Sequence, residues 1–408
     1  MGRCMIFFNL ERSQRIAFAF GAALLCLVSG GWWLVQTFHT DHAPFWVTGY
    51  LPAYRHNGRE IPFLVDADYR VLTHLAHASV IPRADGSLDI DSNSLHPDSQ
   101  QAALQAANHH DLPLLLVVTG TYEQFMPALQ AEVRPQFIAN LLQLLDSGYD
   151  GIDIDMEPIT RDETQGNPAF NAFIHELHTA LQTRSNAQLH RTPLLTAAIT
   201  LRDRYIMAQL AGYFDQINLM AYDMAQPHAG WISWYDSALY NGGLVFPGYS
   251  HQVPSVDLWV QRLLAAGIPS AKLGLGISLD VACWQGGEGT TTGGVTAPSQ
   301  AWRSLPYYRK RSYAASYAPM QQAGFTPNAI HWDSTAQMAW FGHDAQDATQ
   351  DFFCNFNDER AIQAKIAYAK QQGLGGIMIW ELGLDQLDNL PATQRRPLRQ
   401  AINQALEK

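Results

Sequence analysis

Three acidic residues alternate with apolar residues in the stretch Asp150 to Pro158, which reads DGIDIDMEP. Asp153, Asp155 and Glu157 occupy every second position, so a β-strand here places all three carboxylates on one face. Burying three acids side by side costs several kcal/mol unless they share protons and accept hydrogen bonds. A purely structural role, such as a solvated acidic strand edge, therefore explains the pattern poorly.

Such a row of carboxylates favours acid catalysis, because neighbouring acids raise the pKa of one member and keep it protonated near neutral pH. Glu157 is the last of the three and lies nearest the C-terminal end of the strand. In a parallel barrel that end opens into the active site. We therefore predict that Glu157 donates a proton, which contributes about 100- to 10,000-fold in rate.

The elements around this strand predict an α/β fold, a (β/α)8 TIM barrel. Apolar runs of strand length alternate with segments of helical spacing, such as Arg134 to Leu145 and Glu359 to Gln372. Eight strand candidates follow one another at 46–51, 71–81, 112–120, 151–157, 193–200, 214–223, 272–279 and 375–381. A bare barrel needs about 250 residues, so the range 45–395 leaves about 100 for an insertion. We predict a small α+β subdomain at about 281–356, in the loop after strand 7.

Composition limits the classes of partner. The chain has 408 residues, 47% of them apolar, and a formal net charge of -11 without a basic cluster. This charge argues against nucleic acid as a partner, and a neutral polymer fits it better. The paired histidines His109 and His110, and His74 with His77, lack carboxylate or cysteine partners at metal-ligand spacing. We therefore expect no metal and no cofactor, and we expect a monomer.

The N-terminal segment predicts export. Residues 1–15 carry Arg3, Arg12 and Arg15 and are expected to stay cytoplasmic, whereas residues 16–38 lack formal charges. This run is either a signal peptide or a membrane anchor, and Trp32 and Trp33 at its end favour the anchor. The protein is then membrane-anchored and faces the periplasm or the exterior, or is secreted if the leader is cleaved.

Two cysteines, Cys283 and Cys354, lie beyond this leader. In an exported domain they form either one disulfide or a pair of buried thiols, and the sequence leaves both open.

The motifs resemble those of glycoside hydrolase family 18. The family signature DxxDxDxE is matched by Asp150, Asp153, Asp155 and Glu157. Further matches follow in the expected order: GYLPAYR from Gly49, MAYD at 220–223, HWDSTAQMAWF from 331, FNDERAIQAK from 356 and GGIMIWELGLD from 375. The resemblance spans nearly all of residues 45–385.

This resemblance implies a chitinase-like activity, which is hydrolysis of β-1,4 bonds next to N-acetylglucosamine with net retention. The acetamido oxygen of the substrate acts as the nucleophile. Glu157 is then the acid and later the base, Asp155 orients the acetamido group, and Asp153 shares a proton with Asp155. Asp150 lies off the alternating register and is expected to be structural, fixing the entry of the strand.

The resemblance also implies residues that contact the sugar. Tyr222 is expected to bond the acetamido carbonyl, and Trp380 to form an apolar floor beneath the sugar. The remaining substrate-binding candidates are Asp223, Met220, Tyr50 and Tyr122. Met220, Tyr222 and Trp380 also alternate as residues of a barrel core do, which is the competing interpretation.

The third strand departs from the family pattern. It reads VTGTY at 118–122, and Val118 stands where a serine is usual. Val118 cannot bond the innermost aspartate, although Thr119 or Thr121 could compensate. This departure leaves chitin, chitooligosaccharides and peptidoglycan open as substrates. A catalytically inactive, chitinase-like lectin is the alternative from another class.

Overall fold

The computed structural model describes residues 45–55, 71–164, 166–184, 192–314, 329–387, 390–391 and 394–407. The predicted cytoplasmic segment at 1–15 and the predicted signal or anchor at 16–38 lie outside these residues, so both stay predictions. Within the described ranges, no helix is long and apolar enough to cross a bilayer.

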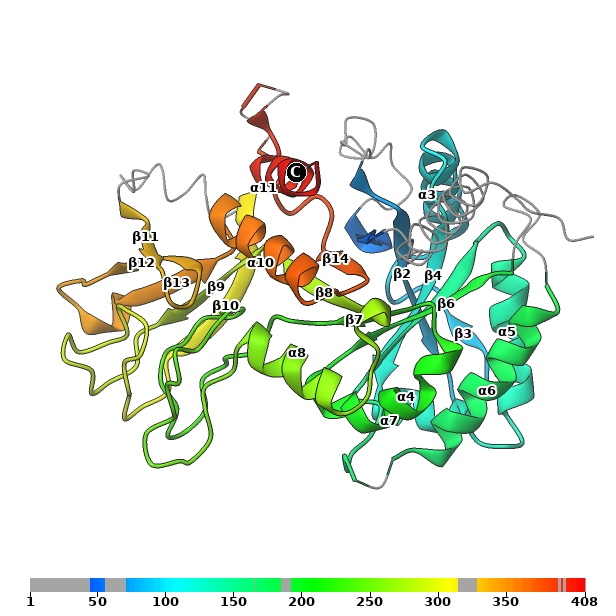
Figure 1. The fold of residues 1–408 in the computed structure, drawn as a ribbon, viewed down its shortest axis with the longest axis horizontal. Coiled ribbons are helices and arrows are strands. Elements are labelled where there is room, and N and C mark those ends of the chain that lie inside the picture. The colour runs from blue at the N-terminus through cyan, green and yellow to red at the C-terminus, as the bar shows by residue number, and fades with distance from the viewer. Residues whose placement is uncertain are drawn as a thin grey trace, which may run out of the picture. The chain divides into compact units, whose positions relative to one another are not determined.

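Eight parallel strands close into a barrel, as the alternation predicts (Figure 1). Neighbours around the ring run β1, β14, β8, β7, β6, β5, β4 and β2, and β2 pairs with β1 to close it. A short strand, β3 (Leu88–Asp89), adds antiparallel to β2. The barrel strands are β1 (Trp46–Pro52), β2 (His74–Pro82), β4 (Leu114–Thr121), β5 (Gly151–Glu157), β6 (Leu194–Ile199), β7 (Gln216–Leu219), β8 (Leu273–Ser278) and β14 (Gly376–Trp380).

Helices cover the outside of these strands (Figure 1). Their apolar faces pack on outward-facing strand residues such as Ile152 and Ile154 in one continuous core. Helix α5 has the predicted bounds, and α10 ends one residue before its predicted end. The described α-helices are α3 (Pro97–His109), α4 (Tyr122–Ala128), α5 (Arg134–Leu145), α6 (Pro168–Gln182), α7 (Arg204–Leu210), α8 (Val256–Ala265), α10 (Glu359–Gln371) and α11 (Pro397–Leu406).

The N-terminal end of the barrel interior is filled by the indole of Trp46. Its Nε1 donates to Asn218 Oδ1 at 3.1 Å. A Cβ at Gly376 would lie 2.4 Å from the Trp46 ring, and one at Gly274 would lie 2.9 Å from Nε1. Glycine on β8 and β14 therefore makes room for the indole, and this end of the barrel is closed.

A second sheet of five antiparallel strands lies between β8 and α10, in the residues predicted to form an inserted subdomain. Figure 1 shows its strands grouped apart from the barrel strands. One face packs on Trp234, Tyr235 and Phe246 from the segment that follows β7. The strands, in sheet order, are β10 (Tyr307–Ser312), β9 (Asp280–Gln285), β13 (Phe352–Phe356), β12 (Met338–His343) and β11 (His331–Asp333).

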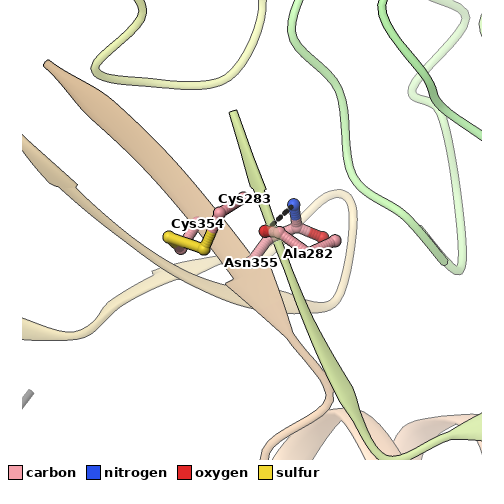
Figure 2. The surroundings of a disulfide bond; sticks show 4 residues. All are labelled: Ala282, Cys283, Cys354 and Asn355. Carbon is pink, nitrogen blue, oxygen red and sulfur yellow. Dashed lines mark hydrogen bonds between the residues drawn. A yellow bond between two sulfur atoms is a disulfide. The ribbon is translucent and has the colours of Figure 1, made fainter. Parts of the chain in front are cut away.

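Cys283 on β9 and Cys354 on β13 form a disulfide, which decides between the two states that the sequence leaves open (Figure 2). The two residues stand directly opposite each other in the strand pairing, with Cα atoms 4.1 Å apart. Beside the disulfide, the Asn355 side chain donates to the carbonyl of Ala282. The disulfide therefore joins the neighbouring strands β9 and β13 of the sheet covalently.

We predict that the double variant Cys283→Ala/Cys354→Ala is less stable than the oxidised protein. The bond closes a loop of 71 residues, which in the chain-entropy description stabilises the folded state by about 4 kcal/mol. Urea unfolding of the oxidised, reduced and double-variant proteins measures the difference. The reduced wild type is the matched control, and an unchanged midpoint after reduction would contradict the prediction.

Candidate active site

The three acids of β5 lie one above another inside the barrel. Asp153 is fully buried, Asp155 is 9% exposed, and Glu157 is exposed at the end of the strand. The strand alternates as predicted, because Ile152 and Ile154 between them point outward into the helix-covered core. The row therefore runs from the barrel interior to its C-terminal opening.

Hydroxyl groups from three other strands bond the two deeper acids. Tyr50 on β1 donates to Asp153 Oδ2 at 2.7 Å, and Thr196 on β6 donates to Asp153 Oδ1. Thr119 on β4 donates to Asp155 Oδ2 at 2.9 Å. The parallel register explains both threonines, since Thr119 is the partner of Asp155 and Thr196 is the partner of Asp153.

The structure thus shows how the row is held without a serine at Val118. Thr119 does not replace the missing bond to Asp153, because its hydroxyl donates to Asp155. Tyr50 and Thr196 donate to Asp153 instead. Tyr50, which the sequence suggests as a sugar contact, is buried and bonded to Asp153. Thr196 is absent from the sequence-based candidates. Only the register between β5 and β6 identifies Thr196 as a partner of Asp153, and the pattern of apolar residues does not give that register.

The environment raises the pKa of each acid in the row. Burial raises the pKa of Asp153 to about 6, against the opposing effect of the Thr196 and Tyr50 hydrogen bonds. Burial and the charges of Glu157 and Asp153 raise the pKa of Asp155 well above its usual range. Although the Glu157 side chain is exposed in part, desolvation of its carboxyl and the charge of the nearby Asp223 raise its pKa. Burial and the mutual repulsion of the carboxylates therefore favour the protonated form within the row.

An aromatic wall completes the interior beside the acids. Tyr222, Tyr50 and Met378 belong to one buried cluster, against which Met220 and Trp380 pack partly buried. The rings of Tyr50 and Trp380 lie 5.8 Å apart, and the Tyr222 hydroxyl lies 3.8 Å from the sulfur of Met378. The structure thus brings together most of the predicted sugar contacts.

Asp223 follows Tyr222 and meets a cation from the second sheet. Lys310 Nζ on β10 lies 3.0 Å from Asp223 Oδ1 and 3.5 Å from both Asp236 Oδ2 and Asp280 Oδ2. Burial of Lys310 is outweighed by these three carboxylates, which raise its pKa. Lys310 therefore stays charged and links the second sheet to the barrel opening. Sequence reasoning missed it, because its three partners come from separate segments.

Two predicted residues lie elsewhere. Tyr122 begins α4, and its ring lies under the guanidinium of Arg161 at 4.6 Å. It packs with the outer core and not with the aromatic wall. Asp150 lies at the opposite end of β5, where its carboxylate accepts the backbone N–H of Leu114 at 2.8 Å. That contact suits a residue that fixes the start of the strand.

The described side chains offer no group of three or more His, Cys, Asp or Glu residues suited to a metal ion.

Comparison with known sequences and structures gives a consistent relationship. The family model "Glycosyl hydrolases family 18" matches residues 47–385. Chitotriosidase-1 of Mus musculus is 30% identical over 296 residues, which are 67% of this chain and 59% of that protein. Chitinase B of Serratia marcescens is 28% identical over 297 residues, 62% of this chain and 58% of that protein. The chain thus spans less than two thirds of these relatives.

Solved structures show the same fold. The Group IV chitinase of Ostrinia furnacalis in complex with allosamidin superposes with a TM-score of 0.70, at 22% identity, over 89% of this chain and 99% of that one. Human YKL-39, described as a pseudo-chitinase with retained chitooligosaccharide binding properties, gives a TM-score of 0.68 at 21% identity, over 89% and 100%. At these identities the likeness concerns the fold.

We predict that Lys310→Met destabilises the protein more as the pH rises. Without the cation, the folded-state pKa values of Asp223 and Asp280, which burial already raises, rise further above their unfolded values. The folded state then binds more protons than the unfolded state, so stability falls as pH increases through the carboxylate range. Urea unfolding at several pH values between about 4 and 8 measures the effect.

Lys272→Met is the matched control for this experiment. Lys272 is also partly buried, but its Nζ donates to the carbonyl oxygens of Ala211 and Phe214. Its loss should cost the same free energy across this pH range. An equal pH dependence for both variants would refute the proposed role of Lys310.

Proposed function

The chain belongs to glycoside hydrolase family 18, and from this we propose that it hydrolyses β-1,4 bonds next to N-acetylglucosamine in chitin or chitooligosaccharides. The proposed mechanism is retaining and substrate-assisted, with the acetamido oxygen of the sugar as nucleophile. The observation that carries the proposal is the complete row of acids with one unoccupied oxygen. Asp155 Oδ1 is buried and has no hydrogen-bond donor among the described residues.

Asp155 suits the orientation of an acetamido group. Its Oδ2 is occupied by Thr119, which fixes the plane of the carboxylate. Its free Oδ1 would accept the N–H of the acetamido group, because a buried acceptor without a donor costs about 1–3 kcal/mol. This bond would turn the acetamido oxygen toward the anomeric carbon, and the negative charge nearby would stabilise the oxazolinium ion.

Glu157 suits the proton transfer. It is the acid at the barrel opening, and burial together with the Asp223 charge raises its pKa. A protonated Glu157 would give its proton to the glycosidic oxygen as the bond breaks. The resulting carboxylate would then accept a proton from the water that opens the oxazolinium ion. Asp153 lies below the other two acids and accepts a hydrogen bond from a hydroxyl group on each oxygen. It would balance the changes of charge on Asp155 and Glu157 during the reaction.

Tyr222 and Trp380 suit the binding of the reacting sugar. Among the described contacts, the Tyr222 hydroxyl has only the sulfur of Met378, a weak acceptor, so it is free to donate to the acetamido carbonyl. The partly buried ring of Trp380 would stack against the apolar face of the sugar. Met220 and Asp223 would border the same sugar.

The disulfide supports export of this domain. Bonds such as Cys283–Cys354 form and persist in oxidising compartments. We therefore propose that the domain works outside the cytoplasm. Whether it stays attached to a membrane depends on residues 16–38, for which anchoring remains a prediction.

The main prediction is that Glu157→Gln lowers kcat on a fluorogenic chitobioside or chitotrioside by about 100- to 10,000-fold, because the amide cannot donate the proton. Assays of the domain from residue 39 onward, on these substrates and on purified peptidoglycan, also rank the substrates. Glu176→Gln is the control, since Glu176 pairs with Arg134 on the outer helices. Equal, negligible turnover by wild type and variant, with oligosaccharide binding retained, would identify a lectin.

A second prediction concerns the nucleophile. A chitotrioside whose reacting sugar carries a free amine in place of the acetamido group should bind but not be hydrolysed, because the attacking oxygen is missing. Azide should not restore turnover in Asp155→Ala, because no glycosyl-enzyme ester forms. Hydrolysis of the amine substrate at a comparable rate would exclude substrate assistance.

A further inference from the structure

The backbone that leaves the proposed acid is clamped on both sides. Ile159 follows Glu157 by two residues and is fully buried. Its N–H donates to Asp203 Oδ1 at 3.0 Å, and its carbonyl accepts from Asn167 Nδ2 at 2.8 Å. Asn167 in turn caps helix α6 by accepting the N–H of Phe170. The backbone N–H and carbonyl of Ile159 are thus both hydrogen-bonded to side chains of other segments.

Asp203 joins this segment to the next strand of the barrel. It lies in the short 3-10 helix Leu201–Asp203 that follows β6, and it is fully buried. Its Oδ2 accepts the N–H and the hydroxyl of Thr200, at 3.2 and 2.8 Å. An ordinary helix cap needs only these local bonds. The other oxygen reaches 44 residues back along the chain, to Ile159.

A second tie joins the same two loops. Arg204, the first residue of α7, pairs with Glu163 in the segment after β5. The loop that follows Glu157 therefore rests on the loop that follows β6 through one buried carboxylate and one ion pair.

The Asp203 carboxylate also contributes to the electrostatics of the site. Its charge is among the causes that raise the pKa of Glu157, after burial and Asp223. The other groups that interact with Glu157 are Asp155 below it, whose carboxyl lowers the Glu157 pKa, and the buried Tyr222. Asp203 is thus joined to the chain after Glu157 by a hydrogen bond, and its charge is felt by Glu157 itself.

We propose that Asp203 is a positioning residue for Glu157, fixing the chain that leaves β5 and adding its charge to the field at the acid. This inference rests on the proposed function for its kinetic consequence, and on the clamp for its structural one. Asp203 touches neither the sugar nor the reacting atoms in this arrangement. Its effect passes through Ile159 and through space.

Two substitutions separate the two effects. Asp203→Asn keeps an oxygen for the Ile159 N–H and removes the charge. The pKa of Glu157 should then fall, and the basic limb of kcat/KM against pH should move to lower pH. Asp203→Ala removes the clamp as well. It should lower kcat by about 10- to 100-fold, as misplaced catalytic groups do, with little change in KM.

Asp215→Asn is the matched control. Asp215 also holds a backbone N–H, that of Leu195 at 2.9 Å, but at the opposite end of β6. It should leave kcat and the pH profile unchanged. If the Asp203 variants lose only thermal stability and keep the wild-type kcat and pH profile, Asp203 is a structural cap and the proposal is wrong. If Asp203→Ala does not fold, the basic limb of kcat/KM against pH in Asp203→Asn decides whether the proposal holds.

Two readouts do not need turnover, so a failure of the proposed function stays distinguishable. Amide hydrogen exchange of residues 159–164 should accelerate in Asp203→Ala and not in Asp215→Asn. The titration midpoint of the ¹³C-labelled Glu157 carboxyl should fall in Asp203→Asn. Should wild type hydrolyse no glycan, the proposed function fails, and these two measurements still decide: changes in both support the clamp, and no change in either overturns it.

Discussion

Three carboxyl groups in one row, two of them buried, can be kept only if other groups bond their oxygens or balance their charge. In this barrel the supporting hydroxyls come from three different strands, β1, β4 and β6. A lysine from the second sheet balances the acids near the opening. The hydroxyls reduce the free-energy cost of the row, and among the described residues one oxygen of Asp155 has no donor. That remaining cost is what a bound acetamido group would relieve.

A parallel barrel suits this task because its register brings specific residues of neighbouring strands side by side. Thr119 and Thr196 stand beside Asp155 and Asp153 through backbone pairing alone. The closed N-terminal end, filled by Trp46, leaves the acids open only at the C-terminal end. The loops after β5 and β6 then hold the chain behind the last acid.

The sequence was sufficient to predict what depends on local periodicity. Alternation along β5 placed the acids, and eight apolar runs predicted the strands of the barrel. The contacts between strands were harder to predict, because Thr196, Lys310 and Asp203 depend on register and on segments far apart in the chain. Tyr50 illustrates the limit: its motif was recognised, but its hydroxyl bonds an acid rather than facing the barrel opening. Tyr122 is a second example, because it begins helix α4 and packs with the outer core.

The closure of the barrel sets the order in which the site can be completed. β1 pairs with β14, so residues near Trp46 meet residues near Gly376 only when the whole intervening chain is available. Tyr50, which supports the deepest acid, and Trp380, which packs beside it, come from these two strands. Contacts of such high sequence separation form late and slow the folding of a domain. The support of the deepest acid and the wall beside it are therefore complete only once the last strand, β14, has closed the barrel.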